Sequence, residues 1–206
     1  MTKPTTLTTG QVRLSYVHLT KPYAMNPGQE PKYSVTILIP KSDVHTKQRI
    51  DAAIEAAIQD GVLSKWGGVR PALLKSPVHD GDGERLNGGP FSAECKGHWV
   101  LAASSKQPVE VVDINLNPIL DQTQIYSGMY GRVSINFFAF NANGNRGIGC
   151  GLNAVQKVAD GEPLGGRISA AQAFGDGFTP TAPSTAAKPA FDPITGQPLS
   201  GGVMGL

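Results

Sequence analysis

The sequence predicts a mainly β domain: a small barrel of about five strands with one inserted α-helix and long loops. Three observations predict this fold class. Several short segments place apolar residues at every second position, as half-buried strands do. One segment instead repeats its apolar residues at helical spacing. The connections between these segments are rich in glycine and proline, which favour turns.

The clearest strand is Lys32–Pro40, in which polar and apolar residues alternate. Because successive side chains of a strand point to opposite faces, this pattern predicts one buried face and one exposed face. The buried face would hold Tyr33, Val35, Ile37 and Ile39, and the other face Lys32, Ser34 and Thr36. The same reasoning predicts further strands at residues 11–19, 94–104, 108–115 and 132–140.

One helix is predicted over residues 43–60. Ser42 or Asp43 can cap its first turn, and Gly61 is expected to end it. Its apolar residues recur at intervals of three and four: Ile50, Ala53, Ile54, Ala57 and Ile58. Residues 63–90 follow as a predicted loop, because glycine, proline and aspartate crowd that segment.

The strand at residues 132–140 has two faces of different character. Its odd positions are apolar and suit a core: Val133, Ile135, Phe137 and Ala139. Its even positions, counted from Tyr130, combine a cation, two small polar groups and three aromatic rings: Tyr130, Arg132, Ser134, Asn136, Phe138 and Phe140. The second face is either a binding surface or a surface that the inserted helix covers.

A glycine-rich stretch follows this strand. Gly149, Gly151 and Ala154 have the G-x-G-x-x-A spacing of a dinucleotide site, but that motif must follow a strand directly and open a long helix. The segment "NANGNR" intervenes, and the residues after the motif are too few for a crossover helix. We therefore interpret the stretch as a glycine-rich turn, with residues 145–147 free to lie against a phosphate.

Composition excludes several classes of protein. The chain has 206 residues and a formal net charge of +2, so any electropositive site must come from the arrangement of its charges. Cys95 and Cys150 are far apart and outside any CxxC motif, which argues against a disulfide framework or a zinc site. No apolar run approaches the ~20 residues of a membrane span. No metal, cofactor or catalytic residue is predicted, since neither the histidines nor any nucleophile motif has the required spacing.

Basic and aromatic residues are interleaved along the predicted strands and the long loop. Proteins that bind single-stranded nucleic acids place cations along the phosphates and provide aromatic rings on which the bases stack. This pattern predicts nucleic-acid binding. The candidate DNA-binding residues are Arg13, Tyr16, Lys32, Trp66, Arg70, Lys96, Tyr130, Arg132, Phe138 and Arg146.

The strand count and the inserted helix fit an OB-fold, a five-stranded barrel that binds oligonucleotides, although the pattern alone also allows a β-sandwich. Residues 10–166 contain, in order, "VRLSYVHL", "YSVTILIPKSD", "IDAAIEAAI", "HDGD", "YSGMYGRVSINFFAFN" and "GNRGIGCGLNAVQKVADGEPLGG". In these blocks the chain resembles a family of bacteriophage single-stranded DNA-binding proteins. The resemblance implies an OB-fold that binds single-stranded DNA without strong sequence preference, during phage replication or recombination, in the cytoplasm of the infected bacterial host.

Three other functions stay open at this point. A recombination mediator that anneals strands as a multimer would need the same stacking and phosphate contacts. A nucleotide-using enzyme could be built around the glycine-rich stretch, and a small β domain also suits a structural virion protein. Phage or host replication and recombination proteins are candidate partners, and the sequence leaves homo-oligomerisation open.

The composition changes after Phe178. Residues 1–178 are predicted to be the DNA-binding domain, and residues 179–206, rich in proline, glycine, threonine and alanine, a flexible tail. Many replication-type single-strand binders end in an acidic tail that recruits partners. This sequence instead ends nearly uncharged, with Val203, Met204 and Leu206 among its last residues.

Truncation after Phe178 tests the predicted boundary. We expect the melting temperature of the truncated chain to stay within a few degrees of the full chain's, because a tail without buried contacts contributes little to stability. Thermal melts of the two chains followed by circular dichroism make the comparison. A large drop in melting temperature would mean that residues 179–206 pack on the domain.

Overall fold

The computed structural model describes residues 3–24, 26–85, 88–142 and 144–165. Within them it contains eight strands, one α-helix and two short 3₁₀ helices. The strands are β1 (Thr6–Thr8), β2 (Val12–Tyr23), β3 (Lys32–Pro40), β4 (Val78–Asp80), β5 (His98–Ser105), β6 (Glu110–Val112), β7 (Tyr130–Ala142) and β8 (Asn145–Ala159). The helices are α1 (Val44–Ser64), η1 (Ala93–Cys95) and η2 (Gln122–Gln124). The predicted tail and its boundary lie outside the described residues.

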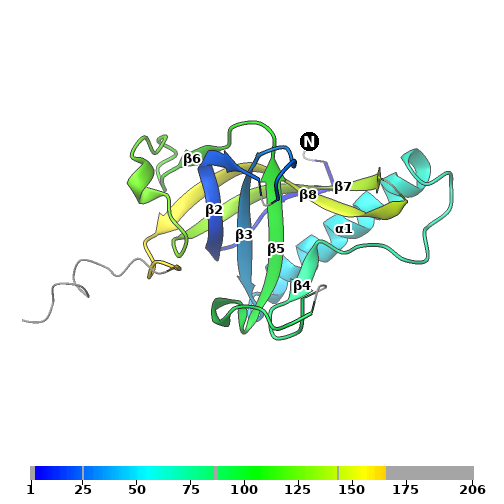
Figure 1. Ribbon diagram of the computed structural model, residues 1–206, viewed down its shortest axis with the longest axis horizontal. Coiled ribbons are helices and arrows are strands. Elements are labelled where there is room, and N and C mark those ends of the chain that lie inside the picture. The colour runs from blue at the N-terminus through cyan, green and yellow to red at the C-terminus, as the bar shows by residue number, and fades with distance from the viewer. Residues whose placement is uncertain (1–2, 25, 86–87, 143, 166–206) are drawn as a thin grey trace, which may run out of the picture. The chain divides into compact units, whose positions relative to one another are not determined.

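Five of the strands close into a ring. β2 pairs with β3, β3 with β5, and β7 with both β8 and β2, all antiparallel, while β5 pairs with β8 in parallel. Figure 1 shows β2, β3 and β5 side by side at the front of this ring. β1, β4 and β6 extend it through pairings with β7, β5 and β8. This arrangement confirms the predicted mainly β fold, a five-stranded closed sheet with one inserted helix.

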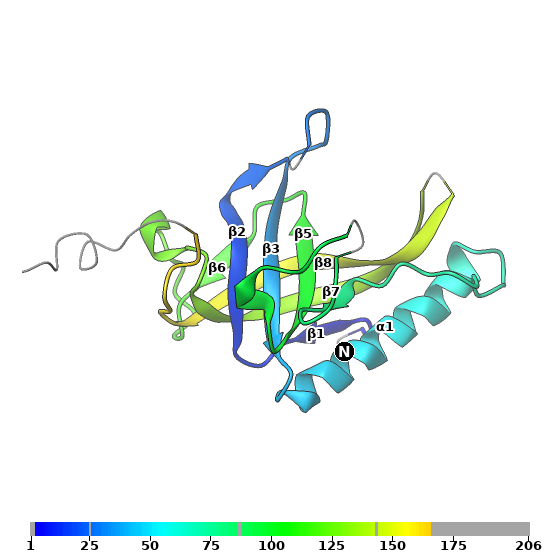
Figure 2. The ribbon, with the colours of Figure 1, turned by 60° about the horizontal axis from the view of Figure 1, so that its bottom comes forward.

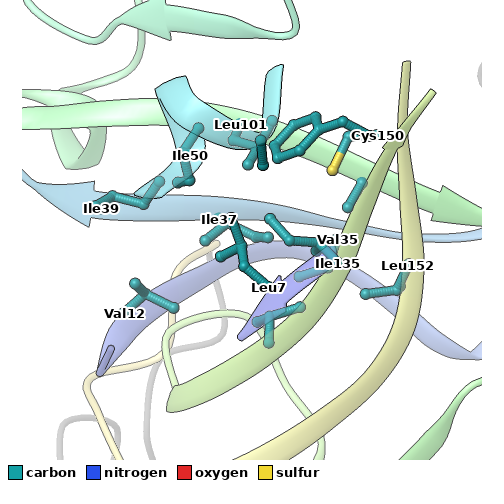
Figure 3. Close-up of a cluster of buried hydrophobic side chains, with 14 of the residues drawn as sticks. Leu7, Val12, Val35, Ile37, Ile39, Ile50, Leu101, Ile135, Cys150 and Leu152 are labelled. Carbon is teal, nitrogen blue, oxygen red and sulfur yellow. The ribbon is translucent and has the colours of Figure 1, made fainter. Parts of the chain in front are cut away.

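The core fills the inside of the ring. The apolar faces predicted for β3 and β7 are buried there, including Val35, Ile37, Val133 and Ile135. Figure 3 shows side chains from β1, β2, β3, β5, β7 and β8 meeting in this cluster, with Ile50 of α1 beside them. Each fully buried Val, Leu or Ile contributes roughly 1.5–3 kcal/mol, so the alternation of β3 and β7 fixes which face of each strand points inward.

Helix α1 begins where the sequence predicts. The Asp43 carboxylate accepts a hydrogen bond from the Thr46 amide at 3.0 Å, which caps the first turn. Hydrogen bonding from Thr46 also lowers the pKa of Asp43, so this capping carboxylate is ionised at neutral pH.

The predicted end of the helix at Gly61 is wrong, because α1 continues to Ser64. Gly61 has a packing role instead. A Cβ atom at this position would lie 2.4 Å from the Cβ of Ala139 and 3.0 Å from the Trp66 ring. Glycine is therefore needed for the close approach of the helix to β7.

The contact between Gly61 and Ala139 also shows which face of β7 the helix covers. Ala139 belongs to the apolar, odd-numbered face, and α1 runs along the β7–β8 hairpin in Figures 1 and 2. The helix therefore packs on the inner face of the hairpin. The outer, even-numbered face keeps Arg132 and Phe138 exposed.

The interpretation of the glycine-rich stretch as a turn is wrong. Residues 145–159 form β8, the longest strand described, which pairs with β7 over its whole length. Buried Ile148, Cys150 and Leu152 alternate with Gly147, Gly149 and Gly151, so the strand has period two with glycine in the outward positions. A dinucleotide fingerprint requires a helix after its glycines, and here the glycines lie within the strand β8.

Smaller differences affect the strand ends. β2 runs on to Tyr23, past the predicted end at Leu19, and β5 begins at His98 after the 3₁₀ helix η1. Within the predicted loop, β4 pairs with β5 through three residues. None of the helices in the described part of the chain is long and apolar enough to cross a membrane.

The positions of the two cysteines lead to a prediction about their reactivity. Both thiols are free and buried; burial raises the pKa of Cys150 to about 12 and also raises the pKa of Cys95. Because the thiolate is the reactive form, we expect neither thiol of the folded protein to react rapidly with an aromatic disulfide reagent at pH 8, and Cys150 to react only when the protein unfolds. Release of the coloured thiolate, with and without denaturant, measures this. Rapid stoichiometric reaction of the native protein would contradict the described packing.

Candidate nucleic-acid interface

A groove of about 950 Å³ lies on the outer face of β2, β3 and β5. Its floor is made of small side chains. Ser34 pairs with Ser104, and Thr36 with Ala102, so these four side chains form two rows across β3 and β5. They belong to the face opposite the core, which is the polar face that the sequence predicts for Lys32, Ser34 and Thr36.

The β2 side of the groove is aromatic. Tyr16, His18 and Tyr23 line it, and the His18 and Tyr23 rings stack with centroids 4.4 Å apart and planes inclined by 11°. Tyr16 and Tyr23 are 54% and 52% exposed, which is high for aromatic side chains in a strand. Rings held in this way offer faces on which a flat ligand can stack.

Tyr16 owes its position to a strained backbone. Its φ angle is +47°, in the left-handed region, and the pairing of β2 with β3 shifts register between Ser15 and His18. A β-bulge of this kind redirects a side chain, and a non-glycine residue at positive φ costs about 1–2 kcal/mol. Such strain clusters at functional sites, which supports a binding role for this side chain.

The opposite side of the groove comes from β4 and from residues 81–85 and 88–97. His79, Arg85 and Phe91 line it. Phe91 packs against a small cluster of buried residues on the outer face of β3 and β5: Leu38, Cys95 and Val100. The Arg85 guanidinium lies 5.5 Å from the centroid of the Phe91 ring, so a cation is held at this wall.

The charges in the groove favour an anion. Lys32 and Arg85 line it together with one carboxylate, Glu30. Glu30 forms an ion pair with Lys106 at 2.6 Å, and the hydrogen bond from Lys106 lowers the pKa of Glu30. Glu30 is therefore ionised at neutral pH but already paired. Within the described residues, no group of three His, Cys, Asp or Glu could hold a metal ion.

The model of one protein family, described as the single-stranded DNA-binding protein of Enterobacter phage Enc34, matches residues 5–183. The chain belongs to this family. No curated protein sequence matches it.

Solved structures agree with this assignment. The single-stranded DNA-binding protein from bacteriophage Enc34 in complex with single-stranded DNA is 30% identical, with a TM-score of 0.68 over 79% of this chain and 91% of that one. Another structure of the Enc34 protein gives 30% identity and a TM-score of 0.65 over 84% and 91%. The single-stranded DNA binding protein gp2.5 of bacteriophage T7 shares only 16% identity at a TM-score of 0.54 over 79% and 90%, which shows a similar fold.

The residues predicted from the sequence to contact DNA fall into three places. Tyr16 and Lys32 line the groove. Five others lie on β2, β7 and β8 away from the groove: Arg13, Tyr130, Arg132, Phe138 and Arg146. The remaining three, Trp66, Arg70 and Lys96, lie outside both regions.

Trp66, one of the candidate DNA-binding residues, is buried. The side chain is 5% exposed, and its indole nitrogen donates a hydrogen bond to the Phe140 carbonyl at 3.2 Å. It packs against Gly61 and belongs to the core, so its ring has no face open to a base. Arg70 forms a two-pronged ion pair with Glu55, at 2.9 and 3.2 Å, and Lys96 is exposed at the end of η1.

Arg13 and Tyr130 lie opposite each other where β2 meets β7, with the Arg13 guanidinium 5.9 Å from the Tyr130 ring centroid. Arg13 also donates to the Glu162 carbonyl at 2.9 Å. The Nε atom of Arg132 donates to the Thr9 carbonyl at 3.3 Å, while the residue as a whole is exposed. Arg146 is exposed at the start of β8, opposite Asn141.

Sequence reasoning missed five residues of the groove: His18, Tyr23, His79, Arg85 and Phe91. Spacing could have found His18, which stands two positions after Tyr16. Tyr23 was missed because β2 was predicted to end at Leu19. Arg85 and Phe91 belong to a loop, and only its packing on β3 and β5 brings them to the groove.

The strain at Tyr16 leads to a prediction about stability. Glycine adopts positive φ freely, whereas alanine has the same Cβ penalty as tyrosine. We therefore expect Tyr16→Gly to be more stable than Tyr16→Ala by about 1 kcal/mol, the reverse of the usual order in a strand. Urea unfolding of the two variants measures the difference. If Tyr16→Ala is the more stable variant, the left-handed conformation at this position is excluded.

Proposed function

We propose that the chain is a phage single-stranded DNA-binding protein that holds DNA in the groove over β2, β3 and β5 without strong sequence preference. The observation that carries this proposal is the arrangement of the groove: exposed tyrosine rings on one side, Arg85 with the half-buried Phe91 on the other, and between them a floor of small side chains beside Lys32. Membership of the Enc34 family and the DNA-bound Enc34 structure support it.

The groove suits unpaired bases for a physical reason. Stacking of a base on an aromatic side chain is worth ~1–3 kcal/mol and is similar for every base, because every base has a π face. Tyr16, Tyr23 and Phe91 offer such rings, and Lys32 and Arg85 stand beside them to meet phosphates. In a duplex the base faces are already stacked on one another. The same groove therefore discriminates against double-stranded DNA.

The other functions that the sequence left open have less support. The strand-annealing mediator is not favoured, since the family and the structures that match are described as single-stranded DNA-binding proteins. The enzyme hypothesis depended on a nucleotide site in the glycine-rich stretch, which is the strand β8. The proposed role is binding without catalysis, in the cytoplasm of the infected host and during replication or recombination of phage DNA. A role as a structural virion protein is not supported by these matches.

Binding to different nucleic acids tests the proposal. We expect oligo-dT and mixed-sequence single strands of equal length to bind with similar affinity, and the duplex form of the mixed sequence to bind more weakly. Fluorescence anisotropy with labelled oligonucleotides at one fixed salt concentration makes the comparison. A preference for duplex would overturn the stacking model.

Variants of the groove separate the contributions of the rings from those of the cations. Tyr23→Ala should weaken binding to single strands by ~1–3 kcal/mol and leave the salt dependence unchanged. Lys32→Ala should instead lower the slope of log K against log[salt] by roughly 0.7, because one phosphate contact is lost. Lys65→Ala is the matched control, since Lys65 is exposed at the end of α1, outside the groove. A slope that changes equally in the two lysine variants would show that the groove has no special role.

A further inference from the structure

A second cavity lies on the outer surface, between the N-terminal segment, α1 and the β7–β8 hairpin. Its volume is about 540 Å³, which is within the usual range for small-ligand sites. The lining combines a ring, two amides, a cation and a carboxylate: Phe138, Asn136, Asn153, Lys3 and Asp60. Neither the core nor the proposed groove makes use of these side chains.

Phe138 is placed at this cavity by the glycines of β8. A Cβ atom at Gly149 would lie 2.6 Å from the Phe138 ring, and one at Gly151 would lie 2.5 Å from the Asn136 side chain. Both side chains therefore lie across the bare backbone of β8. The Phe138 ring is supported on that side and is still 47% exposed, as a stacking platform must be.

Asn153 reaches the cavity through a β-bulge. Ser134 pairs with Ala154 and Ile135 with Leu152, so Asn153 is the extra residue between two paired positions of β8. A bulge redirects the side chain at the point where it interrupts the ladder. Asn153 is exposed and lines the cavity together with Asn136.

The cavity and the groove belong to one continuous surface. A single row of paired residues crosses five strands of the outer face: Ser34 of β3, Ser104 of β5, Gly151 of β8, Asn136 of β7 and Thr6 of β1. Ser34 and Ser104 form part of the groove floor, and Asn136 and Thr6 line the cavity. Two strand spacings, roughly 10 Å, separate Ser104 from Asn136. Between them lies Gly151, over whose backbone the Asn136 amide is placed.

We propose that this cavity is a second contact for the same bound single strand and takes one nucleobase, which stacks on Phe138 after the strand crosses β8 at Gly151. This inference rests on the proposed function, because the groove must hold the preceding nucleotides.

The chemistry of the lining fits a base better than a phosphate. The amides of Asn136 and Asn153 can each donate and accept hydrogen bonds at a base edge. The Asp60 carboxylate accepts hydrogen bonds from N–H groups of a base, such as N3–H of thymine, and repels phosphate, so the phosphate belongs at the Lys3 side of the cavity. The backbone beside Lys3 is held on β7, where the Phe137 amide donates to the Thr5 carbonyl at 2.8 Å.

The test measures the affinity of the full chain for a short and for a longer oligo-dT. Both oligonucleotides are short enough that titrations show one protein bound per oligonucleotide. The measured quantity is the gain in affinity on lengthening the DNA. Phe138→Leu keeps an apolar cover over Gly149 but removes the ring, and Phe140→Leu is the matched control. Phe140 lies over Gly147 on the same face and does not line the cavity. Thermal melts establish that both variants are folded.

We expect Phe138→Leu to reduce the gain on lengthening by roughly 5- to 150-fold, the equivalent of ~1–3 kcal/mol for one stacked base. For Phe140→Leu, the gain in affinity on lengthening the DNA should equal that of the unmodified chain. An unchanged gain in Phe138→Leu would overturn the second contact and leave the groove proposal intact. Equal losses with both oligonucleotides would also overturn it, since Phe138 would then belong to the main site.

The groove is checked separately in the same titrations. Tyr23→Ala should weaken binding of both oligonucleotides; if it weakens neither, the proposed function in the groove fails rather than the second contact. Crosslinking gives an independent readout for the cavity. A longer oligonucleotide with 5-iododeoxyuridine near one end should crosslink to the peptide that contains Phe138 when irradiated. Crosslinks confined to groove peptides at every labelled position would contradict the proposal.

Discussion

The pairing of β7 with β8 is the interaction on which the rest of the structure depends. It extends from Tyr130 opposite Ala159 to Ala142 opposite Asn145, and it closes the ring because β7 also pairs with β2 and β8 with β5. Its inner face carries the core side chains and receives α1 where Gly61 meets Ala139. The helix leaves Arg132 and Phe138 exposed on the outer face, where Ala56 and Asp60 of α1 line the second cavity beside Phe138. The hairpin thus carries core side chains on one face and the proposed second contact on the other, while the proposed groove lies over β2, β3 and β5.

The outer surface of the ring is shaped by small residues. Serine, threonine and alanine form the floor of the groove, and glycine continues it across β8. A ligand can approach the backbone closely wherever side chains are this small. Larger residues stand at the edges, where Tyr16, Tyr23 and Phe91 rise on two sides of the groove and Phe138 lies beyond it. Because small side chains alternate with protruding aromatic rings, the surface is suited to a chain of flat bases.

Much of this fold could be predicted from the sequence, because period two is a direct consequence of strand geometry. β3 has its predicted bounds, and the odd residues of β7 are buried as predicted. β8 follows the same rule, since Ile148, Cys150 and Leu152 alternate with glycines. The sequence predicts a turn for this segment because glycine favours turns. In the structure these glycines instead make room for the side chains of β7. The prediction that Trp66 contacts DNA has a related weakness. Loop residues are expected to be exposed, but Trp66 folds back on α1.

The candidate site was less predictable than the fold. The interleaving of basic and aromatic residues is enough to predict Tyr16 and Lys32, whereas the facing wall depends on how residues 81–85 and 88–97 pack. Nothing in the local sequence of that segment indicates that Cys95 and Phe91 will cover Leu38. The periodicity of apolar residues cannot predict tertiary packing of this kind. It also cannot predict the bulge that turns Asn153 toward the second cavity.

The groove wall formed by residues 81–85 and 88–97 is attached to the sheet by few buried side chains. Its anchor is the small cluster of Leu38, Cys95, Val100 and Phe91, which lies outside the ring and apart from the main core. A segment held by few buried contacts opens at a lower free energy than the whole domain unfolds. The amides of residues 88–97 are therefore expected to exchange with solvent sooner than those of β3 and β5. Because the groove lies on the outer face of the sheet, a long polymer without a free end can enter and leave it from the side, without being threaded.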